Sequence, residues 1–113
     1  MMLAKRLFRF GFENPREAKI NASEGTGYES STGIWIISQS DDDATEWGKT
    51  IAERLVIFLF NRAQIVPYSW TDAGFAHWIE QDPEALSAAS YLPSVSVGEM
   101  PDLAVLAADA AYD

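Results

Sequence analysis

Residues 32–62 constrain the fold more than any other part of the chain. They open with residues 34–37, a run of apolar β-branched and aromatic residues that predicts a short strand with two apolar faces. From residue 44 to residue 60, large apolar residues then recur at the spacing of an α-helix. A strand followed by a long amphipathic helix predicts a sheet that the helix covers on at least one face.

Three consecutive aspartates, residues 41–43, separate this strand from the helix. Ser40 or Asp41 can cap the helix, and the acids that follow lie in its first turn, where amide groups and the helix dipole favour negative charge. Aspartates can also bind Ca²⁺ or Mg²⁺, but the glycine and terminal glutamate of a calcium loop are missing from this sequence at the required spacing. The triplet therefore predicts a helix start and no metal site.

The N-terminal third predicts one further strand. Residues 7–12 place phenylalanine at every second position, which is typical of a strand with one buried face. Pro15 ends that strand and suits the first turn of a short helix over residues 15–22. Residues 23–33 are rich in serine, glycine and threonine and predict a loop. Their glycines match neither the dinucleotide fingerprint nor a P-loop, so we expect no cofactor.

The chain after the long helix predicts shorter elements. Residues 64–70 predict a third strand, which Pro67 restricts to a sheet edge or a bulge. A short helix is predicted over residues 73–81, with Phe75, Trp78 and Ile79 facing inward. Two more elements complete the chain: a short strand within residues 92–100 and a helix over residues 101–112.

This order predicts a single α+β domain over residues 1–113. We expect a small sheet of three or four mostly antiparallel strands, with the long helix packed on one face. A ferredoxin-like or split βαβ layout is the closest common plan, because the second strand, the long helix and the third strand can form a right-handed crossover. Such a layout carries no function by itself.

Charge is distributed unevenly along the sequence. The net charge is −9, from seventeen acidic and eight basic residues, and five of those bases lie within the first nineteen residues. No lysine or arginine follows Arg62. A protein with this balance repels phosphate, so we expect no nucleic-acid partner, whereas the acidic half suits a basic protein partner. The acids after Arg62 are Asp72, Glu80, Asp82, Glu84, Glu99, Asp102, Asp109 and Asp113.

Location and redox chemistry follow from what the sequence lacks. No apolar run approaches the length of about 20 residues that spans a bilayer, so we expect no membrane partner. Residues 1–6 carry their charges after a very short apolar start, unlike a secretory signal. The sequence has no cysteine, which fits a reducing compartment. Together these features predict a cytoplasmic protein.

Few residues are candidates for chemistry. His77 is the only histidine, and with no cysteine it cannot complete a structural zinc site. No nucleophile motif surrounds any serine, so we predict no catalytic residue. Tryptophan is enriched at interface hot spots, and Trp70 and Trp78, which bracket a short polar turn, are the tryptophans we expect to be exposed. The predicted partner-binding residues are Trp70, Asp72, Phe75, His77, Trp78 and Glu80.

Three functions remain open. In the first, the chain is a small non-catalytic acidic protein-binding domain, of inhibitor, immunity or adaptor type, that docks a basic partner through its C-terminal half. In the second, it is a subunit of a homo- or hetero-oligomeric assembly and uses the apolar end of the long helix, residues 55–60. In the third, it is a small enzyme or ligand binder centred on His77. The lack of a catalytic constellation favours the first.

Overall fold

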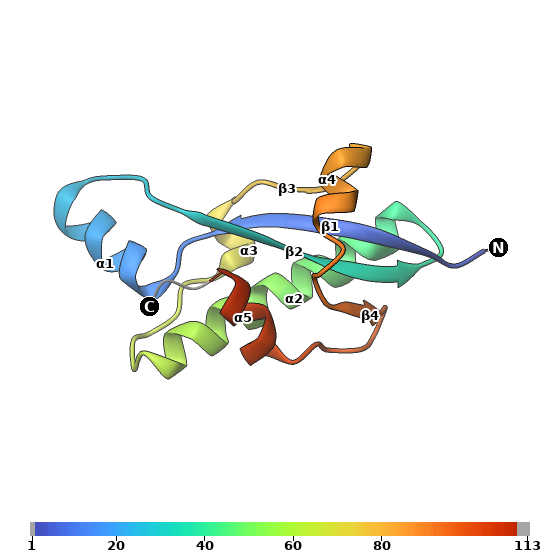
Figure 1. Cartoon of the computed structure of the whole chain (residues 1–113). Helices are drawn as coiled ribbons and strands as arrows, with labels where there is room; N and C mark the ends of the chain where they lie inside the picture. The colour runs from blue at the N-terminus through green and yellow to red at the C-terminus, as the bar shows by residue number, and fades with distance from the viewer. Residues whose placement is uncertain (1, 111–113) are drawn as a thin grey trace.

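The computed structural model describes residues 2–110, and the side chains of residues 2–108. It contains one mixed sheet with helices on both faces, an α+β fold as predicted (Figure 1). Its elements in chain order are β1 (Ala4–Phe12), α1 (Pro15–Glu24), β2 (Ser30–Ser38), α2 (Asp41–Arg62), α3 (Trp70–Ala73), β3 (His77–Ile79), α4 (Pro83–Ala88), β4 (Ser94–Ser96) and α5 (Leu103–Ala110).

The sheet has the strand order β3-β1-β2-β4. β1 and β2 form its long antiparallel centre, in register from Ala4 opposite Ser38 to Phe12 opposite Ser30. β3 adds to β1 antiparallel, and β4 adds to β2 parallel. β3 and β4 are therefore the two edge strands.

The main core lies between the sheet and α2. Phe8, Phe10 and Phe12 project from β1 on this side and are fully buried, as their alternation predicts. The helix comes close to the sheet at Gly48, where a Cβ atom would collide with the ring of Phe8. α5 lies on the same face as α2 and contributes the buried Leu106 (Figure 1).

A smaller core covers the opposite face of the sheet. Leu7 of β1 packs there with Ala89 and Leu92, which follow α4, and the partly buried Trp35 and Leu86 join them. α4 stands on this face alone, so much of the face beside it is left open (Figure 1). The two faces thus differ: α2, α5 and the start of α3 cover one, and the short α4 covers part of the other.

Two predicted elements after α2 are wrong. Residues 64–69 form no strand; Gln64 has a left-handed φ of 61°, and Trp70 begins α3. The helix predicted over residues 73–81 does not form, because α3 ends at Ala73, Gly74 follows with φ 78°, and the chain then extends along β1 as β3. Pairing with an existing strand outweighs the weak helical pattern of this segment.

The ferredoxin-like layout is not confirmed. A split βαβ unit inserts a strand between its two parallel strands, whereas β2 and β4, the parallel pair described here, are direct neighbours. The connection between them also runs through α3, β3 and α4 as well as α2. None of the helices within residues 2–110 has the length and apolar content that crossing a membrane requires.

Candidate functional site

The predicted site residues divide into an inner and an outer group. Trp70 belongs to the inner group, and its predicted exposure is wrong: only 2% of its surface is accessible. Its indole N–H donates to the carbonyl oxygen of Gly11 at 2.8 Å, and its ring packs edge-on against Phe10. Phe75 is also partly buried, against the ring of Tyr68. These two side chains belong to the core.

Trp78 and Glu80 form the outer group together. Trp78 is 44% exposed, because β3 turns its side chain to the sheet face opposite α2. The inward orientation that was predicted for Trp78 on a helix is therefore wrong. Its indole N–H donates to a Glu80 oxygen at 3.3 Å. That hydrogen bond, followed by those from the backbone N–H groups of Asp82 and Gln81 and by the charge of Arg9, holds the pKa of Glu80 below its usual value. Glu80 is therefore ionised at neutral pH.

His77 and Asp72 lie beside this pair and are both exposed. The imidazole of His77 lies against the rings of Trp70 and Phe8, with its Nδ1 3.2 Å from the carbonyl oxygen of Phe75. Asp72 donates its backbone N–H to the hydroxyl of Ser69, which caps α3. Within the described chain, no nucleophile or carboxylate is among the hydrogen-bond partners of the imidazole.

A carboxylate that the sequence did not single out positions this region. Glu53 of α2 lies one turn after Lys49, but Lys49 bonds Glu46, at 3.3 Å. Glu53 accepts hydrogen bonds from the N–H groups of Trp70 and Thr71 and from the hydroxyls of Ser69 and Thr71. It therefore fastens the start of α3, and with it the segment leading to β3, to the long helix.

Hydrogen bonding keeps the Glu53 carboxylate ionised. Partial burial acts to raise its pKa, but the backbone hydrogen bonds from Trp70 and Thr71 and the hydroxyl hydrogen bonds outweigh burial, so its pKa is lowered overall. No local sequence pattern could have revealed this role, because Glu53 lies sixteen or more positions before the groups it binds.

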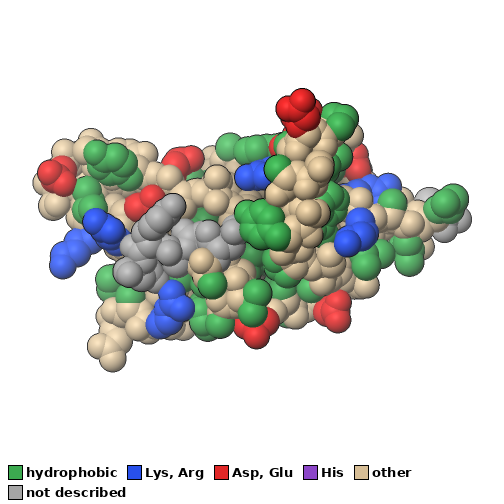
Figure 2. Space-filling model, viewed as in Figure 1, with side chains coloured by type: hydrophobic (Ala, Val, Ile, Leu, Met, Phe, Trp, Pro, Cys, Tyr) green, Lys and Arg blue, Asp and Glu red, His purple; other side chains and the backbone are tan. Residues whose placement is uncertain are grey.

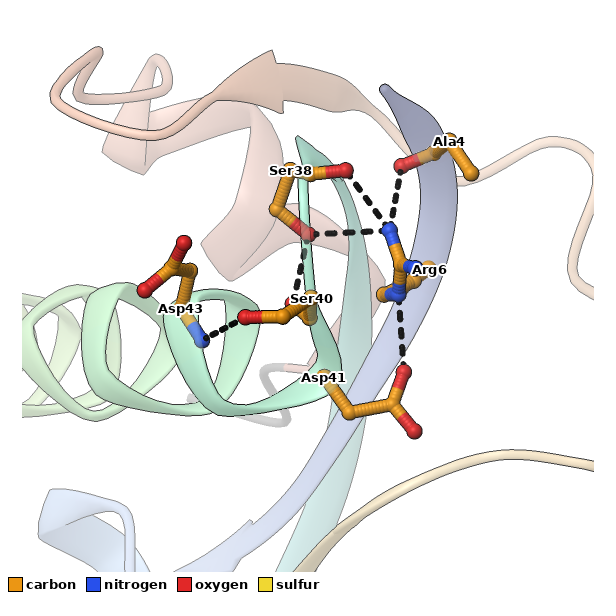
Figure 3. Close-up of polar contacts among 6 residues, drawn as sticks. All are labelled: Ala4, Arg6, Ser38, Ser40, Asp41 and Asp43. Atoms are coloured by element: carbon orange, nitrogen blue, oxygen red, sulfur yellow. Dashed lines mark hydrogen bonds and ion pairs between the residues drawn. The ribbon is translucent and has the colours of Figure 1, made fainter. Parts of the chain in front are cut away.

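The aspartate triplet begins α2, as predicted. The hydroxyl of Ser40 accepts the N–H of Asp43 at 3.1 Å (Figure 3). Arg6 of β1 donates to the Asp41 carboxylate at 2.7 Å and to the carbonyl oxygen of Ser38 at 2.6 Å, which ties the end of β2 to the start of the helix (Figure 3). Within the described chain, no group of three or more acids or histidines is arranged to hold a metal ion.

The apolar end of α2 packs mainly inside the molecule. Leu55, Val56, Leu59 and Phe60 are buried, and only Ile57 among the large aliphatic side chains of residues 55–60 reaches 36% exposure. This arrangement counts against residues 55–60 as an interface between subunits. The exposed candidates are instead on and around β3.

The chain matches no protein-family model, no curated protein and no solved structure.

Proposed function

We propose that this chain is a small acidic protein-binding domain that docks a basic partner protein through β3 and the residues beside it. The observation that carries the proposal is the contrast between Trp78 and the other tryptophans. Trp35, Trp47 and Trp70 each donate their indole N–H to a backbone carbonyl oxygen of a distant segment, at 2.8–2.9 Å. These three hydrogen bonds link distant segments and stabilise the fold. Trp78 bonds only to Glu80, two residues away, and leaves its ring half exposed.

An exposed tryptophan beside an ionised carboxylate has the composition of an interface hot spot. Tryptophan offers a large, rigid contact area at low entropic cost, and a neighbouring carboxylate can meet an arginine or lysine of the partner. The Trp78 side chain is also preorganised for binding, because its hydrogen bond to Glu80 limits its rotamers. Preorganisation of this kind reduces the entropy lost on binding.

The charges around β3 fit a basic partner. Asp72, Glu80, Asp82 and Glu84 follow one another in the chain around β3, and acidic side chains lie at the outer end of α4 (Figure 2). Of two ion pairs among the described residues, Lys49 with Glu46 lies on α2, and Arg6 with Asp41 borders the same hollow as Ile79 and Glu80. Acidic charge accelerates the approach of a basic protein and disfavours acidic competitors, and Arg9, opposite Trp78 on β1, offsets part of it.

A photo-crosslinking experiment tests the proposal. The photoreactive residue p-benzoylphenylalanine replaces Trp78 in one variant and Val105 of α5, which is 55% exposed, in a matched control. We expect a basic protein that is captured from the native lysate at position 78 and not at position 105. The captured protein is then purified and titrated with the unlabelled chain, and Trp78→Ala should weaken binding about tenfold or more.

Two results contradict the proposal. One is equal capture at both positions, which marks nonspecific contact. The other is binding of the purified partner that Trp78→Ala leaves unchanged, which places the interface elsewhere.

A further inference from the structure

We propose that the outer edge of β3 binds its partner by strand addition, pairing with an extended segment that carries lysine or arginine. This inference rests on the proposed function and specifies how the same surface is used. It follows from the backbone of β3 and not from the Trp78 side chain, so the two can fail separately.

The hydrogen-bond pattern shows which backbone groups of β3 face outward. The N–H of Gly11 donates to the carbonyl oxygen of Ala76, and the N–H of Glu80 donates to the carbonyl oxygen of Leu7, both at 2.9 Å. In an antiparallel ladder, residues alternate between bonding the neighbouring strand and facing away from it. Ala76, Trp78 and Glu80 therefore face β1, and the N–H and C=O groups of His77 and Ile79 point to the outer edge.

These outward groups have no hydrogen-bond partner among the described residues. An extended chain placed along β3 could bond all of them: the N–H and the C=O of His77 and the N–H and the C=O of Ile79. Paired backbone groups of this kind supply the affinity in strand addition, and alternate side chains supply the specificity. His77 is exposed at this edge, so an incoming strand can approach it.

The opposite edge of the sheet is blocked by the chain itself at one residue. At Ser96 of β4, the backbone N–H donates to the carboxylate of Glu99 at 3.0 Å, and the carbonyl oxygen accepts the N–H of Glu99 at 2.9 Å. Proteins commonly block exposed edges in such ways, because an open edge recruits other strands. The chain thus blocks β4 at this residue, whereas at β3 neither outward-facing residue of the described chain is blocked in this way.

Charge selects the incoming strand. Trp78 and Glu80 project from the same sheet face, since they are two residues apart on an extended segment. A strand beside β3 therefore places the side chains of one of its faces next to an indole and an ionised carboxylate, and a lysine or arginine fits beside both. A second copy of this chain would instead set two β3 segments side by side, each with its own Glu80, in molecules of net charge −9. Like charges across paired strands are destabilising.

Amide exchange in the intact chain tests the inference. The probe is a synthetic peptide of alternating lysine and valine, which is extended and basic, added to ¹⁵N-labelled protein at low salt. At saturating peptide we expect the exchange rates of the His77 and Ile79 amide hydrogens to fall to about one tenth or less, because each amide then donates to the peptide backbone. The Ser96 amide, already bonded to Glu99, should not change and is the internal control.

A proline variant provides a second test of the inference. Ile79→Pro removes one outward N–H and leaves the ladder with β1 intact, so we expect the fold to persist and peptide binding to weaken at least about tenfold. Peptide of alternating glutamate and valine should not bind. No detectable binding of the lysine peptide, or binding without protection of His77 and Ile79, overturns the inference.

The outcomes separate the inference from the function it rests on. If the captured partner binds wild-type chain, loses affinity with Trp78→Ala and is unaffected by Ile79→Pro, the partner uses the side-chain surface alone and strand addition is wrong. If neither substitution matters, both proposals fail. Slow exchange at His77 and Ile79 without any peptide, together with a dimer in sedimentation, would identify a second copy as the occupant and would also overturn the inference.

Discussion

At the scale of single residues, position in the sheet decides what each tryptophan does. Trp70 and Trp78 are eight residues apart and bracket a polar turn, so their sequence surroundings are similar. Trp70 begins α3 beneath the sheet, where Phe10 and the Gly11 carbonyl complete its surroundings. Trp78 lies on the edge strand, on the face that α4 covers only in part. One therefore stabilises the core, and the other is available to a partner.

This difference predicts unequal effects on stability. Trp70→Ala should lower the free energy of unfolding by about 3–5 kcal/mol, because it leaves a large cavity and an unsatisfied Gly11 carbonyl. Trp78→Ala should cost less than about 1 kcal/mol, because the ring is half exposed and fastens no distant segment. Urea denaturation followed by circular dichroism compares the two. Equal losses would contradict the burial described above.

Gly48 predicts a second residue-scale effect. Replacing an exposed helical glycine with alanine usually stabilises a helix, by about 1 kcal/mol. At Gly48 the added Cβ would collide with Phe8, so Gly48→Ala should instead destabilise the protein by about 1–3 kcal/mol. Gly27→Ala, at a loop site with open space around the glycine, is the matched control and should change thermal stability little. A stabilised Gly48→Ala variant would show that α2 lies farther from β1.

At the scale of elements, the long helix organises the C-terminal half through one side chain. Glu53 bonds the first turn of α3, and α3 leads directly into β3. The edge strand thus takes its place from two anchors, the pairing with β1 and the carboxylate of α2. Loss of the second anchor should loosen the segment before β3 and leave the central β1–β2 pair unchanged.

Glu53→Gln should therefore destabilise the protein by about 1–2 kcal/mol at neutral pH, as the loss of a helix cap does. Because the pKa of Glu53 is lowered by folding, its contribution is present above the unfolded pKa, near 4.5, and is lost as pH falls through the lower folded value. The stability difference between wild type and Glu53→Gln should thus shrink on acidification. Glu46→Gln, which removes an exposed carboxylate with one lysine partner, is the control and should stay within about 0.5 kcal/mol of wild type. A constant difference at every pH would contradict the assigned role.

At the scale of the whole molecule, charge and sheet architecture point to the same surface. The described bases are concentrated on β1, α1 and α2, and the region from α3 to α5 has none. The open edge strand belongs to that base-free part of the sequence, and in space its basic neighbour is Arg9 on β1. An acidic field and an unpaired edge on the same side of the molecule favour a basic, extended partner over an acidic or compact one.

This arrangement predicts a salt-sensitive association with the lysine–valine peptide. Affinity should fall steadily as ionic strength rises from low to physiological, because screening shortens the reach of exposed charges to about 8 Å. Glu80→Gln should weaken binding about two- to fivefold at low salt, with a smaller effect at high salt. Glu24→Gln, at the end of α1, is the control of equal charge and should have little effect. Affinity independent of salt would contradict the electrostatic part of the proposal.

Much of the fold was predictable from local patterns. The alternating phenylalanines of β1, the apolar run in β2 and the periodic helix α2 with its Ser40 cap each carry their own signal, because a long element must keep one face apolar to be buried. The start of α1 was likewise visible at Pro15, and its cap is the reciprocal pair of Asn14 and Glu17. These elements make up the central sheet and its main covering helix.

The candidate site was only partly predictable. The sequence pointed to the right segment, because aromatic and acidic residues gather there without any base, but it could not separate Trp70 from Trp78 or recognise β3. Three residues are too few to show a period, and their conformation depends on the free edge of β1 beside them.

The sequence by itself determined a strand within β1 and one within β2, the helix α2 and the charge difference between the two halves, since each follows from residues close together in the chain. Only the tertiary structure decided the strand order, the burial of Trp70, the role of Glu53 and the open edge at His77 and Ile79. All four depend on contacts between residues far apart in the chain, which no local pattern records.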